Sequence, residues 1–249
     1  MNGRVPAHLC SILYLCAVMK YKHIFFDLDH TLWDFETNEQ ETLLELYNSH
    51  ALESRGVPSF EAFSTSYVGH NERLWDRFRK GFITRNELRD KRFRLTLLDF
   101  KIGDEALNKK ISEGFLEILP YKTALFPETK ETLDYLAAKD YPMHMITNGF
   151  EETQLLKMKN AGIAHYFTHI ITSEIAGSLK PYREIFDYAI TKASTSARES
   201  IMIGDAMELD IKGAHGAGMD QVYFNPAKPP VDFKPTYTIG HLRELKEIL

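Results

Sequence analysis

The 249-residue chain has only two cysteines, no surplus of positive charge and no apolar run long enough to cross a bilayer. Cys10 and Cys16 both precede residue 20, so no disulfide framework holds the body of the protein together, and this usage suits a reducing compartment. The formal net charge of -5 provides no basic face for a nucleic-acid polymer. Neither a membrane nor a nucleic-acid polymer is therefore an expected partner.

The N-terminus carries the one unusual stretch of the sequence. Leu9 to Val18 is apolar and follows Arg4, which is close to the pattern of a secretion signal. A small-residue cleavage site is missing, however, and Met19 directly precedes the first expected strand. We therefore expect residues 1–18 to be an N-terminal extension of a cytoplasmic protein whose working part starts near Met19, with a secretion signal as the alternative.

The second half of the chain alternates between strand-like and helix-like segments. Such alternation predicts an α/β fold with a Rossmann-like, doubly wound parallel sheet and helices on both of its faces. The apolar run Ile24 to Phe26 supplies a further buried strand. The other expected strands are 143–147, 169–172, 200–203 and 221–224, and the expected helices are 127–139, 151–161, 181–193, 208–217 and 241–249.

A block of about eighty residues separates the first strand from the others and has helical periodicity throughout. Thr37-x-x-Gln40 and Thr84-x-x-Glu87 both match the capping box that opens a helix. The sequence therefore predicts an all-helical domain over residues 35–118, inserted into an α/β core formed by residues 19–34 and 119–249.

The first strand ends in two carboxylates, Asp27 and Asp29, followed by the hydroxyl of Thr31. Along an extended chain the two acidic side chains would point the same way, with Leu28 turned toward the core. The carboxyl ends of parallel strands are where open α/β sheets bind ligands. An acidic strand end that merely faces solvent is the alternative.

Three more polar groups follow strands or precede helices in the second half. Thr147-Asn148-Gly149 offers a hydroxyl and backbone N–H groups at a helix entry, and Lys180 precedes a helix. Asp205 and Asp210 form a second acidic pair after a strand. A capped turn, a solvated lysine and an acidic helix start would explain each of them separately. Together on one edge of a sheet they predict a phosphate site.

These pieces resemble the signature of the haloacid dehalogenase superfamily, and specifically of its phosphatases. The matching segments are Asp27-Leu28-Asp29-His30-Thr31, Thr147, Lys180-Pro181, and Gly204-Asp205 through Asp210. His30 departs from the pattern, in which glycine is more usual. The sequence is also similar to the pyrimidine 5′-nucleotidase branch, in Phe25 to Leu32, in Ile146 to Phe150, and in the helical block from Leu74-Trp75 through Gly81 to Arg89.

The resemblance implies a site for Mg²⁺ and an aspartyl-phosphate intermediate. Asp27, Asp205 and the backbone carbonyl of Asp29 would hold the metal ion. Asp27 would be the nucleophile, and Asp29 would protonate the leaving oxygen and later accept a proton from water.

The remaining motif residues receive supporting roles from the same resemblance. Thr147 and the backbone N–H of Asn148 would hold the phosphoryl oxygens, and Lys180 would neutralise charge on Asp27 and on the phosphoryl group. Asp210 would orient Lys180 or a water molecule of the metal ion. The inserted helical block corresponds to the cap of this superfamily, which closes over the substrate.

The expected substrate is a small phosphorylated metabolite, most specifically a pyrimidine nucleoside 5′-monophosphate. A phosphatase for phosphoglycolate or a sugar phosphate, a mutase related to phosphoglucomutase, and a non-catalytic binding protein are the alternatives. A flat base could stack on an aromatic side chain, although the same residues are expected first of all to form the core of the cap. The aromatic candidates are Trp33, Phe35, Trp75 and Phe78.

Overall fold

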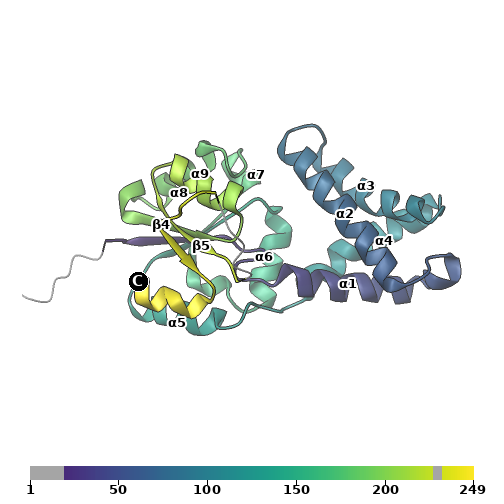
Figure 1. Cartoon of the computed structure of the whole chain (residues 1–249), viewed down its shortest axis with the longest axis horizontal. Helices are drawn as coiled ribbons and strands as arrows, with labels where there is room; N and C mark the ends of the chain where they lie inside the picture. Colours follow the sequence, from purple (N-terminus) through teal and green to yellow (C-terminus); the bar gives the residue numbers. More distant parts are fainter. Residues whose placement is uncertain (1–19, 227–231) are drawn as a thin grey trace, which may run out of the picture.

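The computed structural model describes residues 20–226 and 232–249, so the expected extension over residues 1–18 lies outside the described residues. The described chain forms an α/β part and a helical part that stand side by side (Figure 1). α1 (Phe35–Ser49) runs from the α/β part into the helical part.

Six parallel strands form one sheet in the order β3-β2-β1-β4-β5-β6. This sheet and the helices around it confirm the predicted doubly wound α/β fold. Five strands lie where the sequence predicted them, and β6 was missed because three residues after a proline-rich connection carry too little alternation. The strands are β1 (His23–Phe26), β2 (Met143–Thr147), β3 (Phe167–Thr172), β4 (Ser200–Gly204), β5 (Asp220–Phe224) and β6 (Tyr237–Ile239).

The strand order places β1 in the middle of the sheet, between β2 and β4. From β1 the chain proceeds outward through β2 to β3, and then returns to the other side of β1 to form β4, β5 and β6. The direction of winding therefore reverses between β1 and β4. In open α/β sheets this reversal opens a crevice at the carboxyl ends of the two strands, which is where ligands bind.

Alternation along the strands divides the apolar side chains between the two faces of the sheet. Ile24 and Phe26 belong to a core cluster that includes side chains of α5 (Thr129–Ala138), α6 (Glu151–Asn160) and α10 (Leu245–Ile248). Phe25 belongs to a second cluster, with side chains of α8 (Arg183–Lys192) and α9 (Lys212–Gly216). Both faces are therefore covered, which fixes the register of β1.

The core helices are shorter than the sequence suggested, mainly at their starts. α5 begins two residues after Pro127, and α8 begins two residues after Pro181. The expected helix over 208–217 is a π-helical turn at Met207–Ile211 followed by α9. A short helix not foreseen in the sequence, α7 (Ser173–Ala176), follows β3.

The helical part consists of α1, α2 (Phe60–Arg79), α3 (Arg85–Asp99) and α4 (Glu105–Ile118). The capping box at Thr84 and Glu87 is confirmed. The one predicted at Thr37 is wrong, because the carboxylate of Asp34 accepts the Thr37 N–H at 3.1 Å and starts the helix earlier. We call α1 to α4 the cap. That the cap is a separate domain bounded by residues 35 and 118 stays a prediction.

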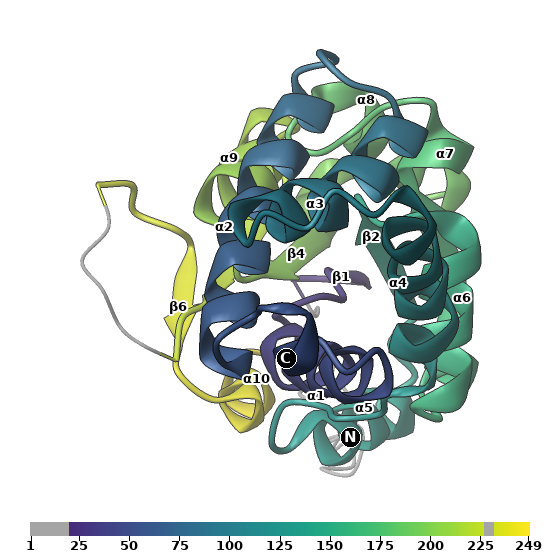
Figure 2. The same cartoon turned by 90° about the vertical axis from the view of Figure 1, so that its right-hand side faces the viewer.

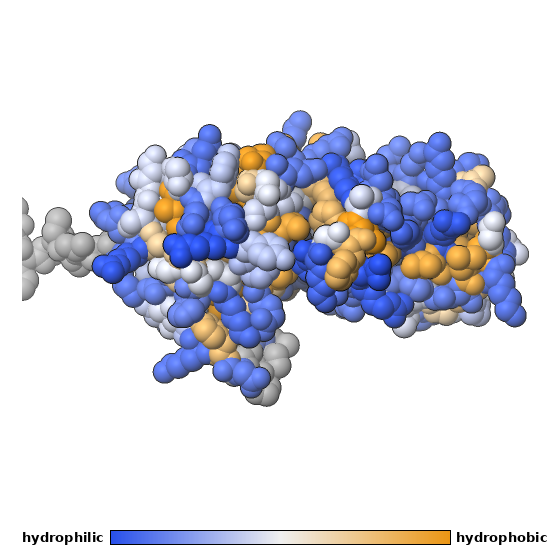
Figure 3. Space-filling view, turned by 90° about the horizontal axis from the view of Figure 1, so that it is seen from above, coloured by the Kyte–Doolittle hydropathy of each residue, from blue (hydrophilic) through white to orange (hydrophobic). Residues whose placement is uncertain are grey.

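Viewed end-on, the cap helices lie in front of β1, β2 and β4 (Figure 2). Hydrophilic residues cover most of the face in Figure 3, and its apolar residues form small separate patches. No helix within residues 20–226 and 232–249 is both long and apolar enough to cross a membrane.

Candidate active site

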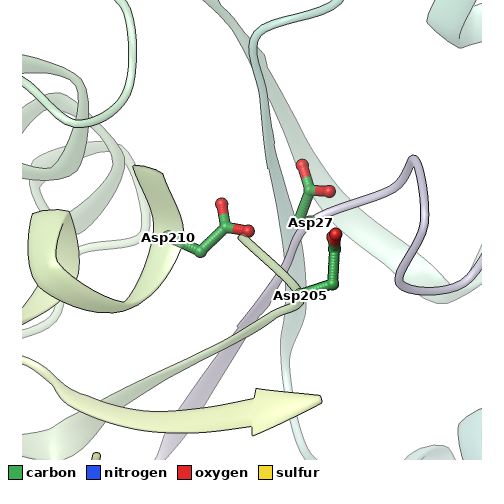
Figure 4. Close-up of side chains that lie close together, drawn as sticks. All are labelled: Asp27, Asp205 and Asp210. Atoms are coloured by element: carbon green, nitrogen blue, oxygen red, sulfur yellow. The ribbon is translucent and has the colours of Figure 1, made fainter. Parts of the chain in front are cut away.

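Three carboxylates converge at the crevice between β1 and β4. Asp27 follows β1, Asp205 follows β4, and Asp210 lies in the π-helical turn after it, with all three side chains pointing into the same space (Figure 4). One oxygen of each lies within 4.8 Å of the others. The three groups line a pocket of about 690 Å³ whose other wall belongs to the cap.

The Lys180 side chain joins two of these carboxylates. Its ammonium lies 2.5 Å from Asp27 Oδ1 and 2.6 Å from Asp210 Oδ1, and it donates to the Ile146 carbonyl oxygen at 2.9 Å. The ammonium is therefore fixed on three sides. The two carboxylates raise the pKa of Lys180 against the opposing effect of burial, so the side chain stays charged.

Burial and mutual repulsion act on the acidic side chains themselves. Burial raises the pKa of Asp27 well above its usual range, although the Lys180 ammonium opposes the shift. Burial, together with the nearby Asp210, raises the pKa of Asp205 to about 7. Thr31 donates its hydroxyl to Asp205 Oδ1 at 2.9 Å and accepts the Asp205 N–H at 3.1 Å, which holds that carboxylate in one orientation.

This donor set fits a hard divalent cation. It offers carboxylate oxygens, and the single Lys180 ammonium leaves an excess of negative charge among the three acidic groups that a divalent cation would compensate. Gly204 allows the close approach, because a side-chain carbon there would lie 2.4 Å from Asp210 Oδ2. The compact cluster includes Asp210 beside Asp27 and Asp205, whereas the sequence had assigned Asp210 only an orienting contact.

Thr147 and Asn148 lie at the end of β2, on the same edge of the sheet. Thr147 Oγ accepts hydrogen bonds from the Gly149 N–H at 3.1 Å and from Gln154 Nε2 at 2.8 Å, which leaves its own hydrogen available to donate. The Asn148 side chain is already used: it accepts the Lys180 N–H at 2.7 Å and donates to the Lys180 carbonyl at 2.9 Å. This side chain therefore anchors the backbone that presents the lysine.

Asp29 lies in the same pocket but bonds to different partners. The Lys157 ammonium donates to Asp29 Oδ1 at 2.7 Å, and Gln154 Nε2 donates to Oδ2 at 2.9 Å. The strand ends at Phe26, so Asp29 belongs to the turn that follows, while Leu28 is buried as expected. Sequence reasoning missed Gln154 and Lys157, although both lie on the buried face of α6 together with Met158.

The cap wall of the pocket includes polar side chains from α1 and α2. Burial raises the pKa of Glu39 to about 7, despite the nearby Arg92 guanidinium. Asn71 is 7% exposed, and its Oδ1 has no hydrogen-bond partner among the described residues. Arg92, behind this wall, likewise has no partner there for its Nε and Nη2.

The four aromatic candidates divide between core and pocket. Trp33 is fully buried in the main core cluster, and Phe78 packs with Leu74, Ile83 and Leu88 inside the cap. Phe35 and Trp75 line the pocket, and both also pack against apolar clusters, Phe35 against the main core and Trp75 against the cap cluster of Leu74. Trp75 is stacked on Phe150, with the ring centroids 5.5 Å apart and 26° between the ring planes.

The site thus has three carboxylates and a lysine at the switch point of a parallel sheet, opposite a helical cap. Residues 21–218 match the family model described as haloacid dehalogenase-like hydrolase. The chain therefore belongs to the haloacid dehalogenase-like hydrolases.

Relatives of known name cover nearly the whole chain. The chain is 29% identical to the pyrimidine 5′-nucleotidase PynA of Streptococcus pneumoniae over 93% of its length and 96% of PynA. It is 30% identical to the pyrimidine 5′-nucleotidase YjjG of Escherichia coli over 93% of its length and 99% of YjjG. The crystal structure of the magnesium-bound HAD-hydrolase YfnB of Bacillus subtilis matches with a TM-score of 0.81 and 28% identity, covering 92% of this chain and 98% of YfnB.

Proposed function

We propose that the protein is a Mg²⁺-dependent phosphate monoester hydrolase that acts through an aspartyl-phosphate on Asp27 and prefers pyrimidine nucleoside 5′-monophosphates. The observation that carries this proposal is the placement of Asp27. It is a buried carboxylate at the switch point of the sheet, paired with Lys180, in a pocket whose far wall holds Trp75 and Asn71. The carboxylates near Asp27 suit a metal ion. The hydroxyl of Thr147 suits a phosphoryl group, and the ring of Trp75 suits a flat base.

The side chains of Asp27 and Asp205 and the backbone carbonyl of Asp29 would hold the Mg²⁺ ion. When bound, the ion neutralises the negative charge that would otherwise repel a phosphate monoester from an anionic nucleophile. Asp205 is oriented for this role by Thr31. Asp210 holds the Lys180 ammonium at 2.6 Å, and its place in the carboxylate cluster makes it a further candidate contact to the ion or its waters.

In the first step an oxygen of Asp27 attacks phosphorus, and the bond from phosphorus to the ester oxygen breaks. Asp29, which has to enter this step in its protonated form, gives its proton to the departing oxygen, so the nucleoside leaves as a neutral alcohol. In the second step Asp29 takes a proton from a water molecule that attacks the aspartyl-phosphate. The carboxylate of Asp27 is regenerated, and inorganic phosphate leaves. Dividing one difficult displacement into two lowers each barrier.

The phosphoryl oxygens bind beside β2. Thr147 is prepared for this role because two donors already occupy its oxygen, which directs its hydrogen elsewhere. The backbone N–H of Asn148 is the second expected donor. Lys180 brings its charge to both Asp27 and the phosphoryl group, and burial strengthens that interaction because little water screens it.

Two observations support the proposed preference for pyrimidine nucleotides: the residues of the cap wall, and the similarity to two pyrimidine 5′-nucleotidases. Stacking of a base on an aromatic ring is worth about 1–3 kcal/mol, which corresponds to a preference of roughly 10–100-fold over a phosphate ester without a base. Trp75 offers such a ring. Asn71 offers a buried, unsatisfied acceptor that suits the ring N–H of uracil or thymine.

The test compares kcat/KM for UMP, dTMP, AMP, phosphoglycolate and a hexose phosphate at equal Mg²⁺ concentration. We expect UMP and dTMP to lead AMP, and AMP to lead the two esters without a base. A lead for phosphoglycolate or the hexose phosphate would overturn the nucleotide preference and leave the phosphatase proposal standing. No turnover of any of the five, or of p-nitrophenyl phosphate, would support a non-catalytic binding protein on the same fold.

A further inference from the structure

We infer that Gln154 and Lys157 are positioning residues that hold Asp29 in place as the proton donor. The inference rests on the proposed function, because it concerns the acid of that reaction. It assigns a role to two residues of α6 that belong to none of the motifs recognised in the sequence.

The two side chains share one face of α6. Residues three apart on a helix are neighbours on its surface, and Gln154 and Lys157 are exposed by only 1% and 2%. The fold makes room for them beside the end of β2. A side-chain carbon at Gly149 would lie 2.4 Å from the Gln154 carboxamide carbon, so the close approach of Gln154 requires glycine there.

Together they occupy both oxygens of the Asp29 carboxylate, Lys157 at 2.7 Å and Gln154 at 2.9 Å. The lysine lies behind the acid, because its side chain is 3% exposed whereas that of Asp29 is 24% exposed. The ammonium also lies 4.2 Å from the centre of the Trp33 ring and 5.1 Å from that of Phe35, which fixes it from the far side. The donors therefore hold the carboxyl group from within, and the second lone pair of each oxygen can still carry the proton that the reaction needs.

Gln154 also connects the acid to the phosphoryl site. Its amide nitrogen carries two hydrogens and lies within hydrogen-bond distance of both Asp29 Oδ2 and Thr147 Oγ. One rigid side chain thus sets the spacing between the proton donor and the hydroxyl that would hold the transferring phosphoryl group. Displacing a reacting group by about 1 Å can cost about 10²-fold in rate, so this spacing matters.

Stability alone does not explain a lysine at this position. Burying an ion pair costs desolvation energy that its attraction often fails to recover, and apolar residues of similar size frequently stabilise such sites equally well. A methionine at position 157 would fill the same space beside Trp33. A lysine retained against this cost, with its ammonium on the carboxylate that faces the substrate pocket, points to a role in the reaction.

The test uses the leaving group to isolate proton donation. The p-nitrophenolate ion leaves without a proton, whereas the alkoxide of a nucleotide requires one. The ratio kcat/KM reports the steps up to departure of the leaving group, so it excludes the later hydrolysis of the intermediate. We expect Lys157→Met to lower kcat/KM for UMP by about 10–100-fold, and for p-nitrophenyl phosphate by less than about threefold. Gln154→Leu should also lower kcat/KM more for UMP than for p-nitrophenyl phosphate, but it should reduce both, because it removes a donor to Thr147 as well.

Three controls accompany these variants. Lys157→Arg keeps the cation and should recover much of the loss on UMP. Lys159→Met removes an exposed lysine of the same helix and should change neither substrate. In an Asp29→Asn background, Lys157→Met should cause little further loss, because the group that it positions has already been removed. If Lys157→Met does not fold, Gln154→Leu carries the comparison between the two substrates.

Equal losses on the two substrates, or a full additional loss in the Asp29→Asn background, would overturn the inference and leave the phosphatase proposal intact. A wild-type protein that hydrolyses neither ester, or an Asp29→Asn variant with unchanged activity on UMP, would instead refute the proposed chemistry itself. The two failures are therefore distinguishable.

Discussion

The two walls of the pocket differ in how completely their polar groups are satisfied. On the sheet side, Lys180 pairs with both Asp27 and Asp210, and Thr31 binds Asp205. On the cap side, Asn71 Oδ1 has no hydrogen-bond partner within the described part of the chain. A buried acceptor without a partner costs about 1–3 kcal/mol, so that wall is the one with most to gain from a ligand.

The difference indicates that the two walls have different functions in the reaction. Charges that are already paired need little rearrangement when the reaction begins, so the sheet side suits chemistry on a phosphate group. Unsatisfied groups in the cap suit recognition of whatever is attached to that phosphate. Substitutions of Asp27, Asp205, Asp210 or Lys180 should therefore reduce turnover of every phosphate ester, and those on the cap side should change the ranking of substrates.

The largest effect is expected at Asp27, the proposed nucleophile. Asp27→Asn changes almost no volume but removes the attacking oxygen, so kcat should fall by more than about 10⁴-fold for UMP and p-nitrophenyl phosphate alike. The thermal unfolding midpoint should stay close to that of the wild type. Asp187→Asn, an exposed carboxylate on α8, serves as the matched control. A variant that retains substantial activity would show that another group attacks phosphorus.

The metal ion should be the next most sensitive point. Asp205→Asn should raise the Mg²⁺ concentration that gives half-maximal activity by at least about 10-fold, as is usual when a metal contact is lost. Asp210→Asn should have the smaller effect on metal affinity, because Asp210 also serves to hold Lys180 at 2.6 Å. Activity titrated against Mg²⁺ in chelator-buffered solution measures both. Full activity in excess chelator would refute the metal site.

A substitution in the cap should distinguish substrate recognition by the cap wall from chemistry on the sheet side. Asn71→Leu keeps the size of the side chain but removes its hydrogen-bonding groups, so KM for UMP should rise by about 10-fold. Turnover of p-nitrophenyl phosphate, which has no base edge to read, should hardly change. Asn48→Leu, an exposed asparagine of α1, is the control. Equal losses on both substrates would contradict the division between chemistry and recognition.

The smallest expected effect concerns stability. Burial raises the pKa of Glu39 from the ordinary value of 4.5 to about 7, so the folded protein binds an extra proton between those two pH values. The free energy of unfolding should therefore fall as pH rises through this window, by about 1–3 kcal/mol from Glu39, and level off above it. Glu39→Gln should flatten that slope in urea unfolding at pH 5, 6, 7 and 8. A parallel slope in the variant would assign the effect to other groups.

The sheet side of the pocket was predictable from the sequence because its groups follow strands. The alternation of strands and helices predicted a parallel sheet, and the carboxyl ends of parallel strands share one edge. Asp27, Thr147 and Asp205 could therefore be placed together without a structure.

The groups inside helices could not be placed in the same way. Lys157 and Lys159 look alike in the sequence, yet one is buried against Asp29 and the other is exposed. Asn71 likewise shares the buried face of α2 with Phe63, Tyr67 and Leu74. A polar residue at an apolar position of a helical repeat was the available signal, but it indicates burial and not the partner. The partner depends on tertiary packing.

The central claim is that a phosphoryl group passes through Asp27, and direct trapping tests it. The protein is mixed with UMP and Mg²⁺, quenched in acid within the first turnover, and treated with borohydride, which reduces an aspartyl-phosphate to homoserine. Peptide mass spectrometry then locates the modified residue. The account predicts homoserine at position 27, and none in the Asp27→Asn variant. A phosphoryl group on a serine or histidine, or homoserine at another aspartate, would contradict it.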